Sequence, residues 1–459
     1  MSATLSVNEP EFAAYVALDW GDTEHAWSLE EAGGGKREQG KLRQTPEAIE
    51  AWATELAARF GGRLVAVALE QSRGALIYSL QKFSHLVFYP IHPSTSSKYR
   101  AAMFPSGSKD DPVDGDLLLD LLVRHRDRLR PLRADSPETR KLQSLVEKRR
   151  QLVDDLTAHK NRITALLKIY YPQALHWFDD LSSPLAVAFL QRWPTLPPLQ
   201  NETPDVVRKF FHTHGSRSTR RIDQRLAEIQ QAKPALEDQA IMDPCVRMVE
   251  ALLQIVAILH QAIAGMEKAI EEVFTHHPDA AIFTSFPGAG KVMAPRLLAA
   301  LGSQRDRWGC VTDFQNYTGV PPVTVRSGKS LWVHFRWACP KFLRQTFHEF
   351  AGLSIQQSEW ARAFYDHRRQ VVSQDHHAAI RALAFKWQRI LFRCWIDRKP
   401  YQEALYQRSL LKSSPPPPQA LSDTSHRSRT KPPNSSGSNP VHFQFKKVAG
   451  FCKLVDPAS

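Results

Sequence analysis

The first 133 residues alternate short apolar runs with amphipathic stretches, and this alternation restricts them to a fold that layers helices on a sheet. Residues 15–20 (Tyr-Val-Ala-Leu-Asp-Trp) and 64–69 (Leu-Val-Ala-Val-Ala-Leu) read as buried strands. Between them, Thr45 and Pro46 form a helix-start signal, followed by apolar residues at helical spacing. The sequence therefore predicts a mixed α/β domain over residues 12–133.

The order of these elements is more specific than their presence. The glycines at 33–35 separate two further strand-like stretches, so three strands precede the first helix. After the strand at 64–69 come a helix near 75–83, a strand at 86–91 and a last helix starting near Pro112. The order β-β-β-α-β-α-β-α is that of an RNase H-like domain, which we therefore expect here.

Four acidic residues fall where such a fold would gather them. Asp19 ends the first strand and Glu70 follows the fourth, while Asp111 and Asp114 lie three residues apart at the start of the last helix, hence on one face. Several carboxylates together supply the hard oxygen ligands that two divalent cations need, with positions left open for phosphate oxygens. The sequence predicts a site for Mg²⁺ or Mn²⁺, with Asp110 as an alternative to Asp111.

The middle of the chain, residues 134–281, is predicted to be helical. Apolar residues at heptad spacing mark two long helices, and in the second they recur as Val249, Val256, Ile263 and Ile270. This pattern predicts a coiled coil, formed either within one chain or between chains. Between the two helices, residues 177–218 are Pro-rich, which predicts an irregular insertion or a small subdomain.

The net charge of +13 is concentrated toward the C-terminus. Residues 286–412 carry 20 Lys and Arg against 8 Asp and Glu and are rich in aromatic residues, whereas the preceding residues are nearly neutral. A basic block of this kind is where a polyanion binds. We expect a mostly helical, basic domain over residues 282–412 and, because of its Pro, Ser and Asn content, a disordered tail over 413–459.

The sequence also bears on the compartment. The N-terminus lacks a signal-peptide pattern and no run of eighteen apolar residues is present, which predicts a cytoplasmic, nucleoid-associated protein without a membrane partner. The five cysteines form no C-x-x-C pair, which disfavours a disulfide framework or a zinc site and predicts buried, reduced thiols.

Six short blocks, spread over about residues 12–400, carry a family resemblance. Near the N-terminus the most distinctive has Lys109, Asp111 and Asp114 in a Lys-x-Asp-x-x-Asp spacing. The blocks resemble those of the DEDD transposases of bacterial insertion sequences, the family that includes Piv-type DNA invertases and bridge-RNA-guided recombinases. They are residues 16–21 (Val-Ala-Leu-Asp-Trp-Gly), 69–74 (Leu-Glu-Gln-Ser-Arg-Gly), 108–114 (Ser-Lys-Asp-Asp-Pro-Val-Asp), 287–290 (Pro-Gly-Ala-Gly), 316–321 (Asn-Tyr-Thr-Gly-Val-Pro) and 326–329 (Arg-Ser-Gly-Lys).

This resemblance implies a RuvC-like catalytic domain, a C-terminal transposase domain, donor and target DNA as substrates, a structured guide RNA, and a dimer or tetramer. It also places Ser327 at the position of the family's nucleophilic serine, with Ser330 as the alternative. A hydroxyl beside Arg326 and Lys329 has cations to balance phosphate charge. The chain departs from the family at residues 337–341 (Trp-Ala-Cys-Pro-Lys), where a Lys-Arg-Gly-Asn-like stretch usually follows the serine.

The Pro-Gly-Ala-Gly turn before a helix resembles a helix-hairpin-helix phosphate contact. Two other functions compete with a serine recombinase: a junction-resolving nuclease that uses the carboxylates and water, and a non-enzymatic architectural or RNA-binding protein. The residues predicted to contact nucleic acid are Gly288, Gly290, Lys291, Arg326, Lys329, Arg336, Lys341 and Arg344.

Overall fold

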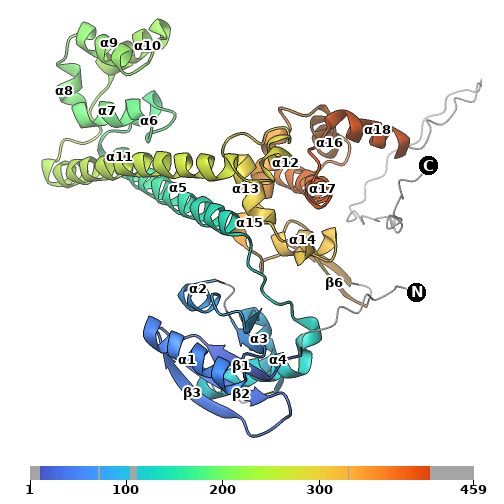
Figure 1. Cartoon of the computed structure of the whole chain (residues 1–459). Helices are drawn as coiled ribbons and strands as arrows, with labels where there is room; N and C mark the ends of the chain where they lie inside the picture. Colours follow the sequence, from blue (N-terminus) through green and yellow to red (C-terminus); the bar gives the residue numbers. More distant parts are fainter. Residues whose placement is uncertain (1–10, 71–72, 104–110, 329, 414–459) are drawn as a thin grey trace, which may run out of the picture. The chain divides into compact units, whose positions relative to one another are not determined.

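The computed structural model describes residues 11–70, 73–103, 111–328 and 330–413 (Figure 1). The chain divides into two compact units, Met1–Glu403 and Ala404–Ser459. Of the second unit, the description covers only the greater part of α18 (Glu403–Ser413). The tail predicted to be disordered therefore lies, apart from its first residue, outside the described residues.

The N-terminal part of the chain is built on a five-stranded sheet of order β3-β2-β1-β4-β5. The first three strands pair antiparallel, and β1, β4 and β5 pair parallel. This is a mixed α/β sheet with the strand order along the chain that the sequence predicts, consistent with an RNase H-like domain. The strands are β1 (Ala14–Asp19), β2 (Glu24–Glu31), β3 (Glu38–Arg43), β4 (Val65–Leu69) and β5 (Leu86–Pro90).

Alternation along the parallel strands sends side chains to two separate cores. Val16 and Val67 pack with α1 (Pro46–Arg59) and α2 (Ala75–Leu80), whereas their neighbours Ala17 and Ala66 pack with the leucines of α4 (Asp111–His125). Helix α1 begins as predicted, with the Thr45 side chain accepting from the Ala48 N–H. The helices therefore cover both faces of the sheet, which explains why the parallel strands are continuously apolar.

One helix of this part was not predicted. Helix α3 (Pro93–Met103) has Ser96 as its only buried residue, so its sequence lacks the apolar periodicity by which helices are recognised. A 3₁₀ turn, η1 (Arg126–Arg128), follows α4.

The middle region is helical, as predicted, and its two long helices pack against each other within one chain. They are α5 (Pro137–Tyr170), capped by Ser136, and α11 (Gln239–Thr275). The buried residues of α11 include all four of the predicted heptad positions Val249, Val256, Ile263 and Ile270. Supercoiling of this pair stays a prediction.

The insertion between the long helices takes the second of its two predicted forms, a small subdomain, and is not irregular. It folds as short helices around an aromatic core that includes Phe189, Trp193 and Phe211. Its prolines begin helices rather than break them, because the first helical turn has no N–H to lose. The helices are α6 (Ala174–Trp177), α7 (Pro184–Arg192), α8 (Leu196–Gln200), α9 (Pro204–Thr213) and α10 (Thr219–Gln231).

Among the described helices, α11 alone is long and apolar enough to cross a membrane, with a mean hydropathy of 1.6 in its most apolar stretch. Only 28% of that stretch is buried. One helix of this kind is weak evidence for a membrane span, since core helices of other proteins have the same composition. Its packing against α5, α7 and α13 accounts for the buried part of its apolar surface.

The last region is mostly helical, with one hairpin that was not predicted. Its core contains the fully buried Trp387 and Trp395. The hairpin strands β6 (Val323–Ser327) and β7 (Ser330–His334) are largely exposed, so no buried apolar run marks them in the sequence. The other elements are α12 (Ala280–Thr284), α13 (Met293–Leu301), η2 (Arg305–Arg307), α14 (Val311–Thr318), α15 (Lys341–Ser354), α16 (Glu359–Gln370) and α17 (His376–Asp397).

The cysteines of the described part are free, as expected for reduced thiols. The prediction that they are buried is wrong: Cys310 is exposed, and Cys245, Cys339 and Cys394 are half-buried. Scattered single cysteines carry no periodic signal, so their burial could not be assigned one by one from the sequence.

His348 on α15 makes the stability of this region pH-dependent. Burial, with help from Arg381 and Arg344, lowers the pKa of His348 to about 4, and its Nε2 has no hydrogen-bond partner among the described residues. The unfolded chain binds a proton near pH 6.5, so stability is full above that pH and is lost as pH falls toward 4. We expect the melting temperature of His348→Phe to fall less between pH 7.5 and 5 than that of the wild type. Equal falls in melting temperature for the two proteins would contradict this.

Candidate functional site

Two of the predicted carboxylates lie next to each other at one edge of the sheet. Strands β1 and β4 are parallel with Leu18 opposite Leu69, and Asp19 and Glu70 are the next residues of the two strands. Both carboxylates are half-buried. The parallel register therefore brings together two acids that are about fifty residues apart in the sequence.

Helix α4 brings its N-terminus to the same edge. Directly after its far end, Arg126 donates to the Tyr15 hydroxyl over 2.8 Å and lies over the Phe12 ring; Tyr15 is near the start of β1 and Phe12 just precedes it. Helix α4 therefore runs antiparallel to β1 and begins where β1 ends. A Cβ at Gly115 would lie 3.1 Å from the Ser28 Oγ, so this helix lies close against β2.

The acidic residues of α4 differ in how fully they are described. Asp111 is the first residue of the helix and its side chain is not described, while Lys109 and Asp110 lie outside the described residues. Asp114, one turn later, is 7% exposed. The structure thus brings Asp19, Glu70 and the start of α4 to one edge, and a cluster of all four carboxylates stays a prediction.

Helix α3 connects the two sides of this edge. The Ser96 hydroxyl donates to Glu70, and Arg100, one turn later, forms an ion pair with Asp114. Ser96 is buried, and the Arg100 side chain is 23% exposed. Neither residue was predicted, because α3 contacts the site through polar side chains and has no apolar pattern. Both are positioned to orient carboxylates.

The donor set at this edge has the chemistry of a hard-cation site. Carboxylate oxygens are the ligands that Mg²⁺ and Mn²⁺ prefer. Among the described residues, whose side chains do not include Asp111, no group of three or more His, Cys, Asp or Glu is close enough to hold a metal ion. Arg100 balances the charge of Asp114. A cation bound there would therefore either share the Asp114 carboxylate with Arg100 or displace Arg100 from it.

The candidate nucleophile lies at the tip of the hairpin. Ser327 ends β6 and pairs with Ser330, the first residue of β7, and both side chains are exposed. Gly328 adopts a φ of +54°, which a turn of this tightness favours. Arg326 is exposed beside Ser327, and Lys329 lies outside the described residues. The hydroxyl is thus open to a large substrate such as DNA.

The basic residues after the hairpin divide into two kinds. Arg344 donates to the Arg336 carbonyl over 2.8 Å and stacks 4.1 Å from the Phe335 ring centre, and Arg336 donates to the Asn316 side chain. These two arginines therefore hold the segment between β7 and α15. Lys341, at the start of α15, is exposed and available to a ligand.

The Pro-Gly-Ala-Gly turn shows a packing role for one of its glycines. Gly288 has a φ of +81°, and a Cβ there would lie 2.9 Å from the Leu353 carbonyl carbon. At Gly290 a Cβ would meet nothing within 4 Å. Lys291, directly after the turn, pairs with Glu271 on α11 over 2.9 Å. A phosphate contact by this turn stays a prediction.

Gly288→Ala is expected to destabilise the protein by about 2 kcal/mol, since it adds both backbone strain and a contact with fixed backbone atoms. Gly290→Ala is the matched control, because its Cβ has space and its φ is not positive. Chemical denaturation of the two variants measures the difference. Equal stabilities of the two variants would show that the packing against Leu353 does not require glycine at position 288.

Comparison with known proteins identifies the family. A family model described as a transposase matches residues 16–172, and a model of the IS116/IS110/IS902 transposase family matches residues 280–366. The first match contains Asp19, Glu70 and Asp114, and the second contains the hairpin with Ser327.

Two relatives from Streptomyces coelicolor extend the likeness over most of the chain. A protein named "Mini-circle putative transposase for IS117" is 30% identical over 355 residues, which are 76% of this chain and 85% of the relative. A protein named "Insertion element IS110 uncharacterized 43.6 kDa protein" is 24% identical over 86% of this chain and 97% of the relative. The chain therefore belongs to the IS116/IS110/IS902 family of transposases and acts in DNA recombination by transposition.

Proposed function

We propose that this transposase cuts and rejoins DNA with two chemical groups carried by different parts of the chain. The carboxylates Asp19, Glu70, Asp111 and Asp114 hold Mg²⁺ or Mn²⁺, and Ser327 is the nucleophile. The observation that carries the proposal is the meeting of Asp19, Glu70 and the start of α4 at one edge of the sheet. A lone acid at a strand end would carry no such inference.

Each residue at the carboxylate edge has a distinct role in this proposal. Asp19 and Glu70 present oxygens from neighbouring strands, Ser96 orients Glu70, and Arg100 orients Asp114. When bound, the metal would polarise the scissile phosphate and neutralise the charge that develops on it. Orientation by α3 keeps the carboxylates in place whether or not DNA is bound.

Ser327 supplies the covalent step. Its Oγ loses a proton and attacks the phosphorus, and the bond to a deoxyribose oxygen breaks, which leaves a free DNA hydroxyl and a phosphoserine link. A DNA hydroxyl of the second strand then attacks the same phosphorus and releases the serine, so no phosphodiester energy is lost. Arg326 and Lys329, beside the serine, balance the phosphate charge.

The proposed domains divide the remaining tasks. Residues 12–133 form the RuvC-like catalytic domain, 134–281 the helical coiled-coil region, 282–412 the basic transposase domain, and 413–459 the tail. The basic domain contacts donor and target DNA and a structured guide RNA. The residues proposed to make these contacts are Gly288, Gly290, Lys291, Arg326, Lys329, Arg336, Lys341 and Arg344.

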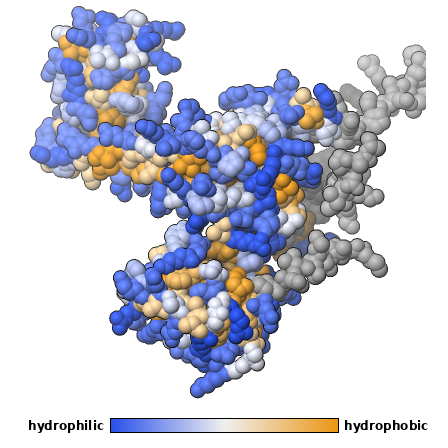
Figure 2. Space-filling view, in the orientation of Figure 1, coloured by the Kyte–Doolittle hydropathy of each residue, from blue (hydrophilic) through white to orange (hydrophobic). Residues whose placement is uncertain are grey.

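Assembly as a dimer or tetramer is supported by apolar surface on α11. Ile241, Met248 and Ile255 recur every seven residues on this helix and are exposed, as is Ile258. Figure 2 shows apolar surface over the long helices. A stripe at heptad spacing is typical of a helix that pairs with a second helix. The assembled protein would act in the cytoplasm at the nucleoid.

A reconstituted reaction tests the proposal as a whole. The purified protein, with the nucleic acid that co-purifies, is incubated with donor and target DNA and Mg²⁺, and the products are sequenced. We expect a discrete structured RNA and recombinant junctions. Cut DNA without junctions would favour a nuclease that uses water, and binding without any cleavage would favour an architectural protein.

A further inference from the structure

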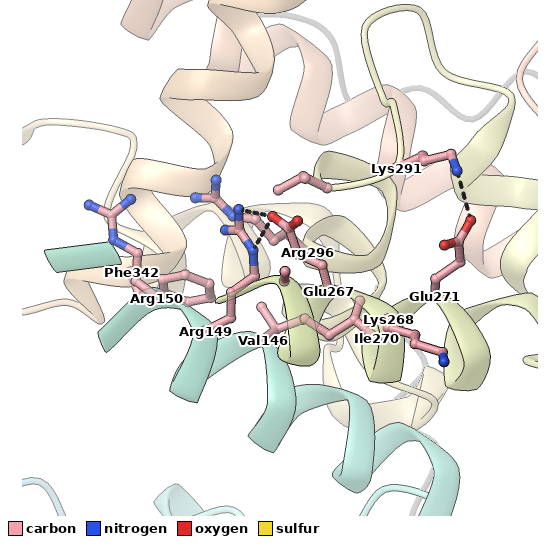
Figure 3. Close-up of a pocket in the computed structure, with 12 residues that line it drawn as sticks. Val146, Arg149, Arg150, Glu267, Lys268, Ile270, Glu271, Lys291, Arg296 and Phe342 are labelled. Atoms are coloured by element: carbon pink, nitrogen blue, oxygen red, sulfur yellow. Dashed lines mark hydrogen bonds and ion pairs between the residues drawn. The ribbon is translucent and has the colours of Figure 1, made fainter. Parts of the chain in front are cut away.

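A pocket lies between the two long helices and the basic domain, and none of the candidate catalytic residues lines it (Figure 3). It has a volume of about 320 Å³ and is lined by residues of α5, α11, α13 and α15 and by Lys291 and Val292 just before α13. This volume suits one small ligand. Its apolar wall includes Val146, Ile270, Val292 and Phe342, and its cationic side chains are Arg149, Arg150, Lys268, Lys291 and Arg296.

The two carboxylates that line the pocket are already engaged. Glu267 accepts from Arg149 over 2.9 and 2.5 Å, and Glu271 pairs with Lys291 over 2.9 Å, as Figure 3 shows. Lys268, by contrast, forms no ion pair among the residues that the structure describes. The remaining cations of the lining, Arg150, Lys268 and Arg296, are therefore not neutralised by any carboxylate that lines the pocket.

The two remaining arginines share one carboxylate and keep unused donors. Arg296 pairs with Glu349 over 2.5 Å, and Arg150 approaches the same carboxylate at 3.6 Å and pairs with Asp154 at 2.9 Å. The Arg296 side chain is only 8% exposed. The Nε–H groups of both arginines are buried and have no acceptor within the described part of the chain. Buried donors without an acceptor are rare, so these two point to an anionic ligand.

The pocket is also continuous with the Pro-Gly-Ala-Gly turn. Lys291 and Val292 follow that turn directly and line the pocket. A nucleic-acid strand whose sugar-phosphate backbone passes the Pro-Gly-Ala-Gly turn would therefore reach the arginines of α5 and α13. Cations beside an apolar and aromatic wall are the combination that single-stranded nucleic acid uses for its phosphates and bases.

We propose that this pocket holds one nucleotide unit of a nucleic-acid strand, with its phosphate facing Arg150, Lys268 and Arg296 and its sugar or base against Val292 and Phe342. The choice of a strand as occupant rests on the proposed function. The same chemistry would accept a free nucleotide, and the experiment below separates the two sources.

Photocrosslinking of the full-length protein tests the proposal directly. The photoreactive residue p-benzoylphenylalanine replaces Val292 in the pocket or, as a control, Ile169, which is exposed near the far end of α5. With a labelled single-stranded oligonucleotide, we expect a crosslink at Val292 and none above background at Ile169. Free AMP is expected not to reduce the crosslink; loss of the crosslink with AMP, while overall DNA binding persists, would assign the pocket to a free nucleotide.

A charge variant provides the second measurement. Lys268→Gln is expected to weaken oligonucleotide binding about fivefold at low salt and to reduce the slope of log affinity against log salt by about one, as the loss of one phosphate contact does. Lys168→Gln, on the exposed surface at the end of α5, removes the same charge and should leave the slope unchanged. If the wild type binds the oligonucleotide but the protein with p-benzoylphenylalanine at Val292 gives no crosslink, the pocket proposal alone is overturned. Absence of any nucleic-acid binding overturns the proposed function instead.

Discussion

Ser327→Ala is expected to abolish both cleavage and joining of DNA, lowering the reaction rate by a factor of about 10⁴ or more. The substitution removes the atom that bonds to phosphorus and changes neither the charge nor the carboxylates. Because Ser327 is exposed at the hairpin tip, its loss should alter neither stability nor DNA binding. Rates of recombinant formation, measured beside binding affinity and melting temperature, separate these effects.

Ser330→Ala is the matched control for this experiment. Ser330 is paired directly across the hairpin from Ser327, also has an exposed side chain, and lies in the same basic surroundings. We expect the Ser330 variant to retain activity. The reverse result, with activity lost at Ser330 and kept at Ser327, would move the nucleophile by three residues and leave the rest of the site in place.

Asp19→Asn and Glu70→Gln are expected to lower the rate of strand exchange by a factor of about 10³ or more, since each removes a charged ligand and costs several kcal/mol of transition-state stabilisation. Both side chains are half-buried, so folding should survive the change. Asp114 is a poorer choice, because its replacement would also leave Arg100 without its ion-pair partner.

Asp22→Asn serves as the control for the carboxylates. Asp22 is an exposed acid in the turn after β1, so its replacement changes the net charge equally without removing one of the proposed metal ligands. Recombination is measured over a range of Mg²⁺ and Mn²⁺ concentrations for all three variants. Wild-type rates for Asp19→Asn at every metal concentration would remove the carboxylates from the mechanism.

The parts of the fold that could be predicted from the sequence are those in which burial leaves a pattern. Strand β4 is buried at every position and reads as an unbroken apolar run, and α1 carries its own cap in Thr45. The ends of such strands then located Asp19 and Glu70. Local rules were sufficient here because they agree with the tertiary contacts.

Elements that make polar contacts or are exposed could not be found in this way. Helix α3 holds Ser96 and Arg100 against the carboxylates, yet only one of its residues is buried. The hairpin of Ser327 is exposed on both faces, so no buried apolar run marks its strands, although Val323, Val325 and Val333 are residues that strands favour. In the insertion, proline content left an irregular segment and a small subdomain both open, and the helices could not be located, because Pro184 and Pro204 stand in the first turns of helices.

The most direct measurement of the central claim is the chemical identity of the protein–DNA link. Labelled target DNA is incubated with the full-length protein, its co-purifying nucleic acid and Mg²⁺, separated on a denaturing gel, and any retained species is digested and mapped by mass spectrometry. We predict a covalent adduct whose modified residue is Ser327 and which is absent from the Ser327→Ala protein. Cleavage at full rate with no adduct, or an adduct at another residue, would contradict the account.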